Sequence, residues 1–308
     1  MLISPELAQT VAAIVDERSF EGAARRLRIS PSAVSQRLRT LESQLGSVLV
    51  IRSRPIRVTR AGATVVRLAR QYEVIAHEAT VELGLESRDR MHVPIAVNAD
   101  SLSLWLLPAL EHVTHDHDVT FELLREDEDR TASLLESGAA LAAITSQRRP
   151  IAGCTVTALG ATEYVAVATP AFAARWFPDG AGADALAAAP VIEFDRSDDV
   201  QSDWMRAKGV DPDVPPRHYV PASEDYAAAV RLGMGWGMLP PAHAEASLEI
   251  GTLVRLGPPD IVEPLFWQQW NLDSPALAAI RDSVVRHARA ALVQDGAERA
   301  GARGRWAS

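Results

Sequence analysis

The sequence predicts an α/β protein with a helical head, one long helix and a larger body of alternating strands and helices. Three patterns lead to this prediction. Residues 20–45 hold two amphipathic stretches at helical spacing with a short break between them. Residues 60–86 contain no proline and repeat apolar side chains at intervals of four and three. From residue 92 onward, short apolar runs alternate with helical patterns, which is typical of a parallel sheet.

The head begins with a helix that we expect from Ile3 to Arg18, capped by Ser4-Pro5. A second helix, Phe20–Leu27, ends at the break Arg28-Ile29. A third helix begins at Ser30-Pro31, because the serine offers a capping hydroxyl and proline suits the first helical position. The second and third helices therefore form a helix–turn–helix.

The third helix is expected to bury one apolar face and to expose a polar one. Its buried stripe is Val34, Leu38, Leu41 and Leu45. The exposed amide of Gln36 and guanidinium of Arg39 suit base edges in a major groove. The residues expected to contact DNA here are Ser32, Ser35, Gln36, Arg37, Arg39 and Thr40. The alternative is an ordinary helical hairpin with a solvated polar face.

A basic hairpin comes next along the chain. Residues 48–51 and 56–58 are rich in β-formers and flank the turn Arg52-Ser53-Arg54-Pro55. We expect Arg52 and Arg54 to contact DNA phosphates beside the groove.

Charge is distributed unevenly along the chain. The net charge of −9 argues against nucleic acid, yet residues 1–70 hold 12 arginines against 5 acids. The remaining residues hold 19 basic residues against 35 acids. This asymmetry confines the expected DNA contact to the head.

The long stretch Arg60–Glu86 predicts a helix with a heptad-like seam. We interpret it as a dimerisation helix, with contacts at Val65, Leu68, Tyr72 and Ile75. The alternative is a monomeric connector buried on the C-terminal body. The polar run Ser87–Arg90 is interpreted as a hinge.

The body is expected to contain nine strands and six helices. The expected strands are 93–98, 119–124, 140–144, 154–159, 164–169, 191–194, 237–239, 253–256 and 265–270. The expected helices are 102–112, 129–137, 170–176, 200–207, 224–232 and 275–292. The first five elements form a βαβαβ pattern and thus a parallel sheet. The Gly/Ala/Arg-rich tail 296–308 is expected to be disordered.

The head resembles the LysR-type transcriptional regulators. The matching residues are Ser19-Phe20, Ala23-Ala24, Leu27, Ser30–Ser35, Leu41-Glu42, Leu45-Gly46 and Thr59–Gly62. This resemblance implies a winged helix-turn-helix DNA-binding domain at 1–59 and a linker and dimerisation helix at 60–87. It also implies an effector-binding domain at 92–295 with the fold of periplasmic solute-binding proteins. Its first subdomain would combine 92–162 with 268–295, and its second would be 163–267. The assembly would be a homodimer or homotetramer on double-stranded promoter DNA.

A ligand is expected beyond the carboxyl ends of the strands, where helices begin. The expected contacts are Asn98, Ala99, Asp100, Ser101, Ser103, Trp105, Thr145, Ser146, Glu224, Asp225 and Trp267. Residues 97–110, with 194–199 and 223–225, look like the arginine/lysine-responsive (ArgP/LysG-like) branch of the family. The carboxylates suit a cationic amino acid. Alternatively, Glu224 and Asp225 only stabilise a helix dipole, and Trp105 is a core residue.

We expect no enzyme, no cofactor and no metal. The sequence has no P-loop, G-x-S-x-G or G-x-G-x-x-G motif, and His112, His115 and His117 are interpreted as a solvated loop. No apolar run is long enough to cross a membrane, and the N-terminus lacks a signal-peptide pattern. A single Cys154, interpreted as a structural thiol, fits a cytoplasmic protein. The alternatives are a regulator of this type with another effector, an architectural DNA-binding protein without ligand, and an α/β solute-binding protein or enzyme.

Overall fold

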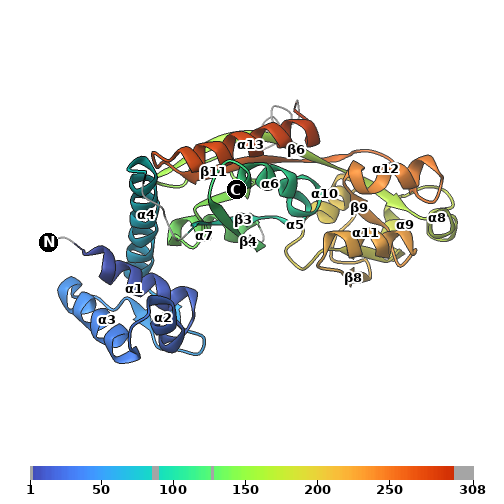
Figure 1. Cartoon of the computed structure of the whole chain (residues 1–308). Coiled ribbons are helices and arrows are strands. Elements are labelled where there is room, and N and C mark those ends of the chain that lie inside the picture. The colour runs from blue at the N-terminus through green and yellow to red at the C-terminus, as the bar shows by residue number, and fades with distance from the viewer. Residues whose placement is uncertain (1–2, 85–89, 126–127, 295–308) are drawn as a thin grey trace. The chain divides into compact units, whose positions relative to one another are not determined.

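The computed structural model describes residues 3–84, 90–125 and 128–294, and Figure 1 labels its elements. The chain forms two compact units. Unit 1 comprises Met1–Val97, Leu110–Thr157 and Trp267–Ser283. Unit 2 comprises Asn98–Ala109, Ala158–Phe266 and Val284–Ser308.

Three short helices open unit 1: α1 (Pro5–Asp16), α2 (Phe20–Leu27) and α3 (Pro31–Leu45). Each is capped by a serine whose hydroxyl accepts an N–H of the first turn, and the cap of α3 is the predicted Ser30. The predicted helix–turn–helix is confirmed. The first helix ends two residues earlier than predicted, and Arg18 two positions later has a left-handed φ of 49°.

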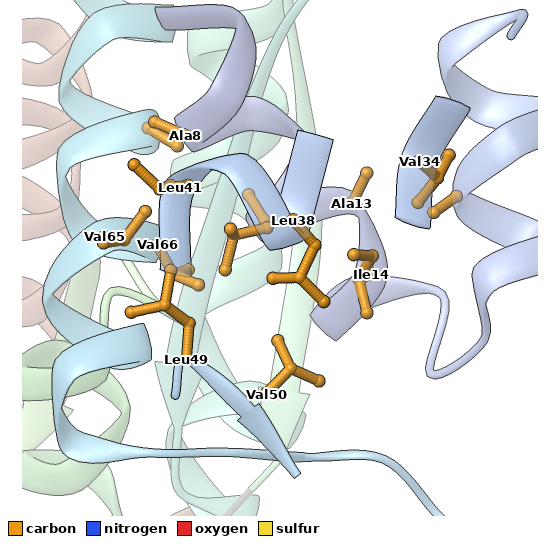
Figure 2. Close-up of a cluster of buried hydrophobic side chains, with 14 of the residues drawn as sticks. Ala8, Ala13, Ile14, Val34, Leu38, Leu41, Leu49, Val50, Val65 and Val66 are labelled. Atoms are coloured by element: carbon orange, nitrogen blue, oxygen red, sulfur yellow. The ribbon is translucent and has the colours of Figure 1, made fainter. Parts of the chain in front are cut away.

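The core of the head is built from all three helices and from the hairpin after α3. Val34, Leu38 and Leu41 are buried as predicted, and Leu45 packs partly buried against them (Figure 2). Leu49 and Val50 close this core from the hairpin side.

The wing has two antiparallel strands, β1 (Val50–Ile51) and β2 (Arg57–Val58), which are shorter than predicted. The Glu42 carboxylate on α3 accepts the Leu49 N–H at 2.8 Å and so fixes the start of the hairpin. Behind it, a Cβ on Gly62 would lie 2.0 Å from the Leu49 carbonyl oxygen. Only glycine therefore permits the close approach of the next helix to the wing.

That next helix is α4 (Arg60–Glu82), capped by Thr59 and about 35 Å long. It ends four residues before the predicted Glu86, because Leu83 forms the cap and Gly84 has a left-handed φ of +64°. The predicted hinge falls mostly on residues 85–89, which lie outside the described residues.

The rest of unit 1 contains a parallel sheet. Strand β3 (Met91–Val97) pairs in parallel with β4 (Val119–Arg125) and with β5 (Ala142–Thr145). Helix α7 (Glu128–Ser137) connects β4 to β5, so the predicted βαβαβ pattern is confirmed. The strand order is β11-β5-β3-β4, where β11 is Ile261–Trp270 and enters unit 1 at Trp267.

Unit 2 is organised around one long strand. The segment predicted as two strands is a single strand, β6 (Cys154–Ala168), because Gly160 adopts a φ of +128° and the chain stays extended. Its unit 2 partners include β9 (Gly237–Leu239) and β10 (Val254–Arg255), both antiparallel. A separate parallel pair joins β7 (Val191–Glu193) to β8 (Arg217–Tyr219).

Helices cover both faces of β6. The unit 2 helices are α5 (Ala99–Ser101), a π-helical segment (Leu102–Leu106), α8 (Pro170–Trp176), α9 (Ala183–Ala188), α10 (Val200–Ala207), α11 (Ser223–Arg231) and α12 (Pro241–Glu249). Side chains alternate along β6: Tyr164 and Ala166 join a cluster with Trp204 and Trp236, and Val165 joins the α11 cluster. Helices α9 and α12 are absent from the sequence-based prediction.

Two helices run from one unit into the other. Helix α6 (Leu107–Thr114) continues the π-helical segment, and α13 (Pro275–Ala291) is the predicted closing helix. Within the described residues, no helix combines the length and the apolar character needed to cross a bilayer.

Candidate functional site

The polar face of α3 is exposed. Gln36 and Arg39 both face solvent, and the Arg39 guanidinium donates to the Gln36 side-chain oxygen at 3.1 Å. The Thr40 hydroxyl donates to the Gln36 carbonyl at 2.9 Å, and Ser35 is half-buried. An amide and a guanidinium held side by side on an exposed helix can read neighbouring base edges.

The side chains of the two other residues predicted to contact DNA on α3 already have partners within the head. The Ser32 hydroxyl lies 2.8 Å from that of the capping Ser30. Arg37 turns toward α1, where its guanidinium lies 3.6 Å from the Glu6 carboxylate. Arg37 is thus less available to DNA than Arg39.

The wing presents two exposed arginines. Arg54 faces solvent at the hairpin tip, and the Arg52 guanidinium lies 5.1 Å from the centroid of the Phe20 ring. A cation–π contact of this kind orients the wing against α2. Sequence reasoning did not select Arg57 and Arg60, which are also exposed beside the wing; only their charge marks them.

The head is joined to α4 by buried charges. The Arg70 guanidinium donates to both oxygens of Asp16 and to Glu73, and Asp16 also pairs with Arg26 of α2. The ion pairs raise the pKa of Arg70 against the opposing effect of burial, so its charge is secure.

The four predicted dimer contacts on α4 divide into two groups. Val65 is buried in the core of the head, and the Tyr72 hydroxyl donates to the Ile3 carbonyl at 3.1 Å. Val65 is therefore a correction: its side chain has no face left for a partner. Ile75 is 57% exposed, and Leu68 is half-buried. The exposed apolar residues of α4 continue with Val81, and Leu83 lies at its cap.

Asp100 is the centre of a polar cluster within unit 2. Its carboxylate accepts the Tyr164 hydroxyl of β6 at 2.8 Å and the Ser223 hydroxyl of α11. Among the described residues it has no ion pair with lysine or arginine. Neutral hydroxyl donors orient this half-buried carboxyl group, and such a group can form charge-assisted hydrogen bonds with a cation.

The residues beside Asp100 supply a cap and an unused donor. The Asn98 side chain accepts the Ser101 N–H at 3.1 Å and so caps α5. The Ser101 hydroxyl is buried and has no hydrogen-bond partner among the described residues. Such a group in a native fold calls for an explanation, and a bound ligand is one.

Glu224 joins the same cluster from α11. Its Oε1 lies 3.3 Å from the Ser103 hydroxyl and 3.2 Å from Nε2 of His243 on α12. Asp225 is exposed in the same first turn. Helix α11 begins after Ala222, which supplies no side chain to cap the N–H groups of that turn.

Four further predicted ligand contacts are buried or half-buried side chains. Trp267 is a correction: it lies fully buried in unit 1, and its indole N–H donates to the Gln269 side chain at 2.7 Å. Trp105 is buried in unit 2, as its core alternative anticipated. In unit 1, Thr145 is buried and accepts the Gln147 N–H at 3.1 Å, and Ser146 is half-buried.

A third carboxylate, Asp198, was noted in the sequence only as part of the 194–199 run. It accepts the N–H groups of Phe194 at 2.9 Å and Val200 at 3.2 Å. Burial raises its pKa to about 6, and among the described residues it has no cationic partner. Gln201 links it to the buried Tyr226 hydroxyl, whose pKa burial also raises.

The histidines and the single cysteine form no metal or nucleophile site among the described residues. His115 pairs with Glu111 at 2.7 Å, and among the described residues no three His, Cys, Asp or Glu side chains lie close enough to hold a metal. Cys154 is half-buried, and burial raises its pKa to about 11, so it is a poor nucleophile.

An exposed helix–turn–helix with a basic wing, joined to an α/β body with a polar cluster, defines a DNA-binding protein with a separate ligand-binding body. Residues 5–63 match the description "Bacterial regulatory helix-turn-helix protein, lysR family", and residues 87–289 match "LysR substrate binding domain". The chain therefore belongs to the LysR family of bacterial transcriptional regulators, and its expected regulatory rather than enzymatic class is confirmed.

Three proteins illustrate its place in the family. "Lysine export transcriptional regulatory protein LysG" of Corynebacterium efficiens is 41% identical over 292 residues, covering 94% of this chain and 99% of that protein. The crystal structure of ArgP from Mycobacterium tuberculosis is 40% identical, covers 96% of this chain and 100% of that one, and has a TM-score of 0.85. The full-length LysG structure from Corynebacterium glutamicum, with bound effector Arg, is 38% identical, with coverage of 94% and 100% and a TM-score of 0.76.

Proposed function

We propose that this regulator senses a cationic amino acid, lysine or arginine, in the cluster around Asp100, and controls the export or metabolism of basic amino acids. The names of its relatives support this proposal, since one is named for lysine export and another was solved with arginine bound. The polar cluster supports it independently.

The observation that carries the proposal is that Asp100 is hydrogen-bonded by neutral hydroxyl groups and has no ion pair among the described residues. Its two oxygens are held by the hydroxyls of Tyr164 and Ser223, which orient the carboxylate without neutralising it. Glu224 adds a second carboxylate to the cluster, where its Oε1 accepts the Ser103 hydroxyl. A ligand that carries two cationic groups complements this pair of carboxylates.

The opposite end of the ligand requires donors. Within the described residues, the buried Ser101 hydroxyl has no hydrogen-bond partner, and the first turn of α11 has no side-chain cap. The α-carboxylate of an amino acid would accept hydrogen bonds from these groups. Asp225 is exposed in that turn and would add to the negative field.

DNA contact is proposed for the exposed face of α3 and the wing, in a dimer or in a tetramer of dimers. Ile75, Val81 and Leu83 would form the dimer surface, since they are apolar and exposed. We retain the division into a DNA-binding domain at 1–59, a linker at 60–87 and an effector domain at 92–295. We also propose a cytoplasmic location, where promoter DNA is found.

Calorimetry tests the ligand. L-Lysine and L-arginine should bind the full-length parent protein, and L-norleucine, which lacks the side-chain cation, should bind much more weakly. Asp100→Asn preserves shape and removes the charge, which should weaken binding roughly tenfold to a hundredfold. Glu249→Gln, at an exposed position on α12, is the control and should bind as the parent does.

Other results would select the alternatives. Binding of an anionic ligand in place of lysine and arginine would indicate a regulator of this family with another effector. Equal affinity for random and promoter DNA, with no ligand bound, would indicate an architectural DNA-binding protein.

A further inference from the structure

His243 lies on α12, a helix that the sequence-based prediction did not include. Helix α12 packs against α11, and the Arg231 guanidinium at the end of α11 donates to the His243 carbonyl at 3.3 Å. The His243 side chain is only 7% exposed, and its partner Glu224 is 69% exposed. A buried imidazole therefore supports an exposed carboxylate.

The geometry fixes which ring nitrogen carries the proton. Nε2 lies 3.2 Å from Oε1 of Glu224, and Nδ1 is buried without a hydrogen-bond partner in the part of the chain that the structure describes. A proton on Nδ1 would be a buried donor with no acceptor, and a bare Nε2 would oppose a carboxylate lone pair. Nε2 therefore carries the hydrogen and donates it to Glu224.

Two donors meet at one oxygen of Glu224. The Ser103 hydroxyl and Nε2 of His243 both approach Oε1, at 3.3 Å and 3.2 Å. Without them, a glutamate in the first turn of a helix would sample several rotamers in solvent. With them, the carboxylate of Glu224 is held in one orientation, and its second oxygen accepts from neither donor.

We propose that His243 is a positioning residue for effector recognition: it holds Glu224 so that this carboxylate receives one cationic group of a basic amino acid. This inference rests on the proposed function, and it adds a specificity-determining contact that acts through Glu224. Because the imidazole touches Glu224 rather than the ligand, its removal should have no effect once the Glu224 charge is gone.

A double-mutant cycle on the full-length protein tests this coupling. Lysine binding is measured by calorimetry for the parent, His243→Ala, Glu224→Gln and the double variant. Each single variant should weaken binding about three- to tenfold, and the double variant should match Glu224→Gln alone. His243→Gln, whose amide N–H is placed near that of Nε2, should restore part of the loss. Glu245→Gln, an exposed position on the same helix, should bind as the parent does.

A second measurement needs no ligand and does not depend on the folding of the alanine variant. The ring nitrogens of His243 in the free protein should show the Nε2–H tautomer by nitrogen-15 NMR, and Glu224→Gln should shift the Nε2 signal. Additive losses in the cycle, or an Nδ1–H tautomer, would overturn the inference while lysine binding by the parent persists. If the parent binds neither lysine nor arginine, the proposed function fails as well.

Discussion

Arg70 of α4 donates to both carboxylate oxygens of Asp16, at 2.7 Å and 2.6 Å, from a side chain that is only 5% exposed. The two residues lie 54 positions apart in the chain, and they join the end of α1 to the middle of the long helix. One guanidinium nitrogen donates to both oxygens and the other donates to Glu73, so this charge-assisted contact ties the end of α1 to the long helix.

Removing one partner should therefore be costly. Asp16→Asn leaves the buried guanidinium with Glu73 alone, and we expect a loss of about 3 kcal/mol in the free energy of unfolding. Urea unfolding, monitored by circular dichroism, measures this loss. Glu82→Gln, an exposed acid on the same helix, should change stability by less than about 0.5 kcal/mol. Equal effects of the two substitutions would show that the buried pair adds nothing.

The DNA interface should separate into base reading and phosphate contact. Gln36→Ala and Arg39→Ala should each cost about 1–3 kcal/mol at the cognate promoter and relax sequence preference. Arg54→Ala should weaken promoter and random DNA alike and flatten the salt dependence of binding. Fluorescence anisotropy with both DNAs over a salt series measures all three. An unchanged ratio of specific to random affinity in both α3 variants would contradict the assignment.

The effect of a glutamate substitution on dimer formation should depend on its position along α4. Ile75→Glu places a charge on an exposed apolar site, so it should yield folded monomers with weak DNA binding. Leu68→Glu should also separate the protomers. Val65→Glu buries the charge in the head and should unfold it instead. Sedimentation gives the mass, and circular dichroism gives the folded state. An intact Ile75→Glu dimer would move the interface elsewhere.

Asp198 should make stability depend on pH. Its pKa is about 6 in the folded chain and near 3.8 when exposed, so the folded state holds this proton more tightly. The contribution of Asp198 therefore disfavours the folded state increasingly as pH rises from about 4 through 6. The stability of the parent relative to Asp198→Asn should fall over that range and level off above pH 7. Urea titrations of both proteins at pH 4.5, 6 and 7.5 check the sign.

Local signals account for the parts of the fold that could be predicted. Serine caps and apolar periodicity are contained within α1, α2 and α3, so the head could be predicted almost residue by residue. Helix α12 was missed because PAHAEASLE shows little periodicity and Ala244 is its one fully buried apolar residue. The long strand β6 was predicted as two strands, 154–159 and 164–169, whereas the chain stays extended through Gly160 with its positive φ.

The candidate site was only partly predictable for a physical reason. Asp100, Ser101 and Ser103 come directly after a strand, so their place at its end is a local property. Tyr164 and His243 reach the cluster through tertiary packing, which no spacing encodes. Trp267 was predicted as a ligand contact but is a core residue, because an aromatic side chain on a strand near the predicted subdomain boundary is equally consistent with a binding surface and with the core.

The long helix contributes Val65 and Val66 to the interior of the head (Figure 2). A fragment that stopped at residue 59 would open that interior to water, so the smallest independently folding head should extend to about residue 74. Because α4 is part of this core, no flexible segment separates the DNA-binding head from the long helix. A rotation of α4 would therefore rotate the exposed residues of α3 by the same amount.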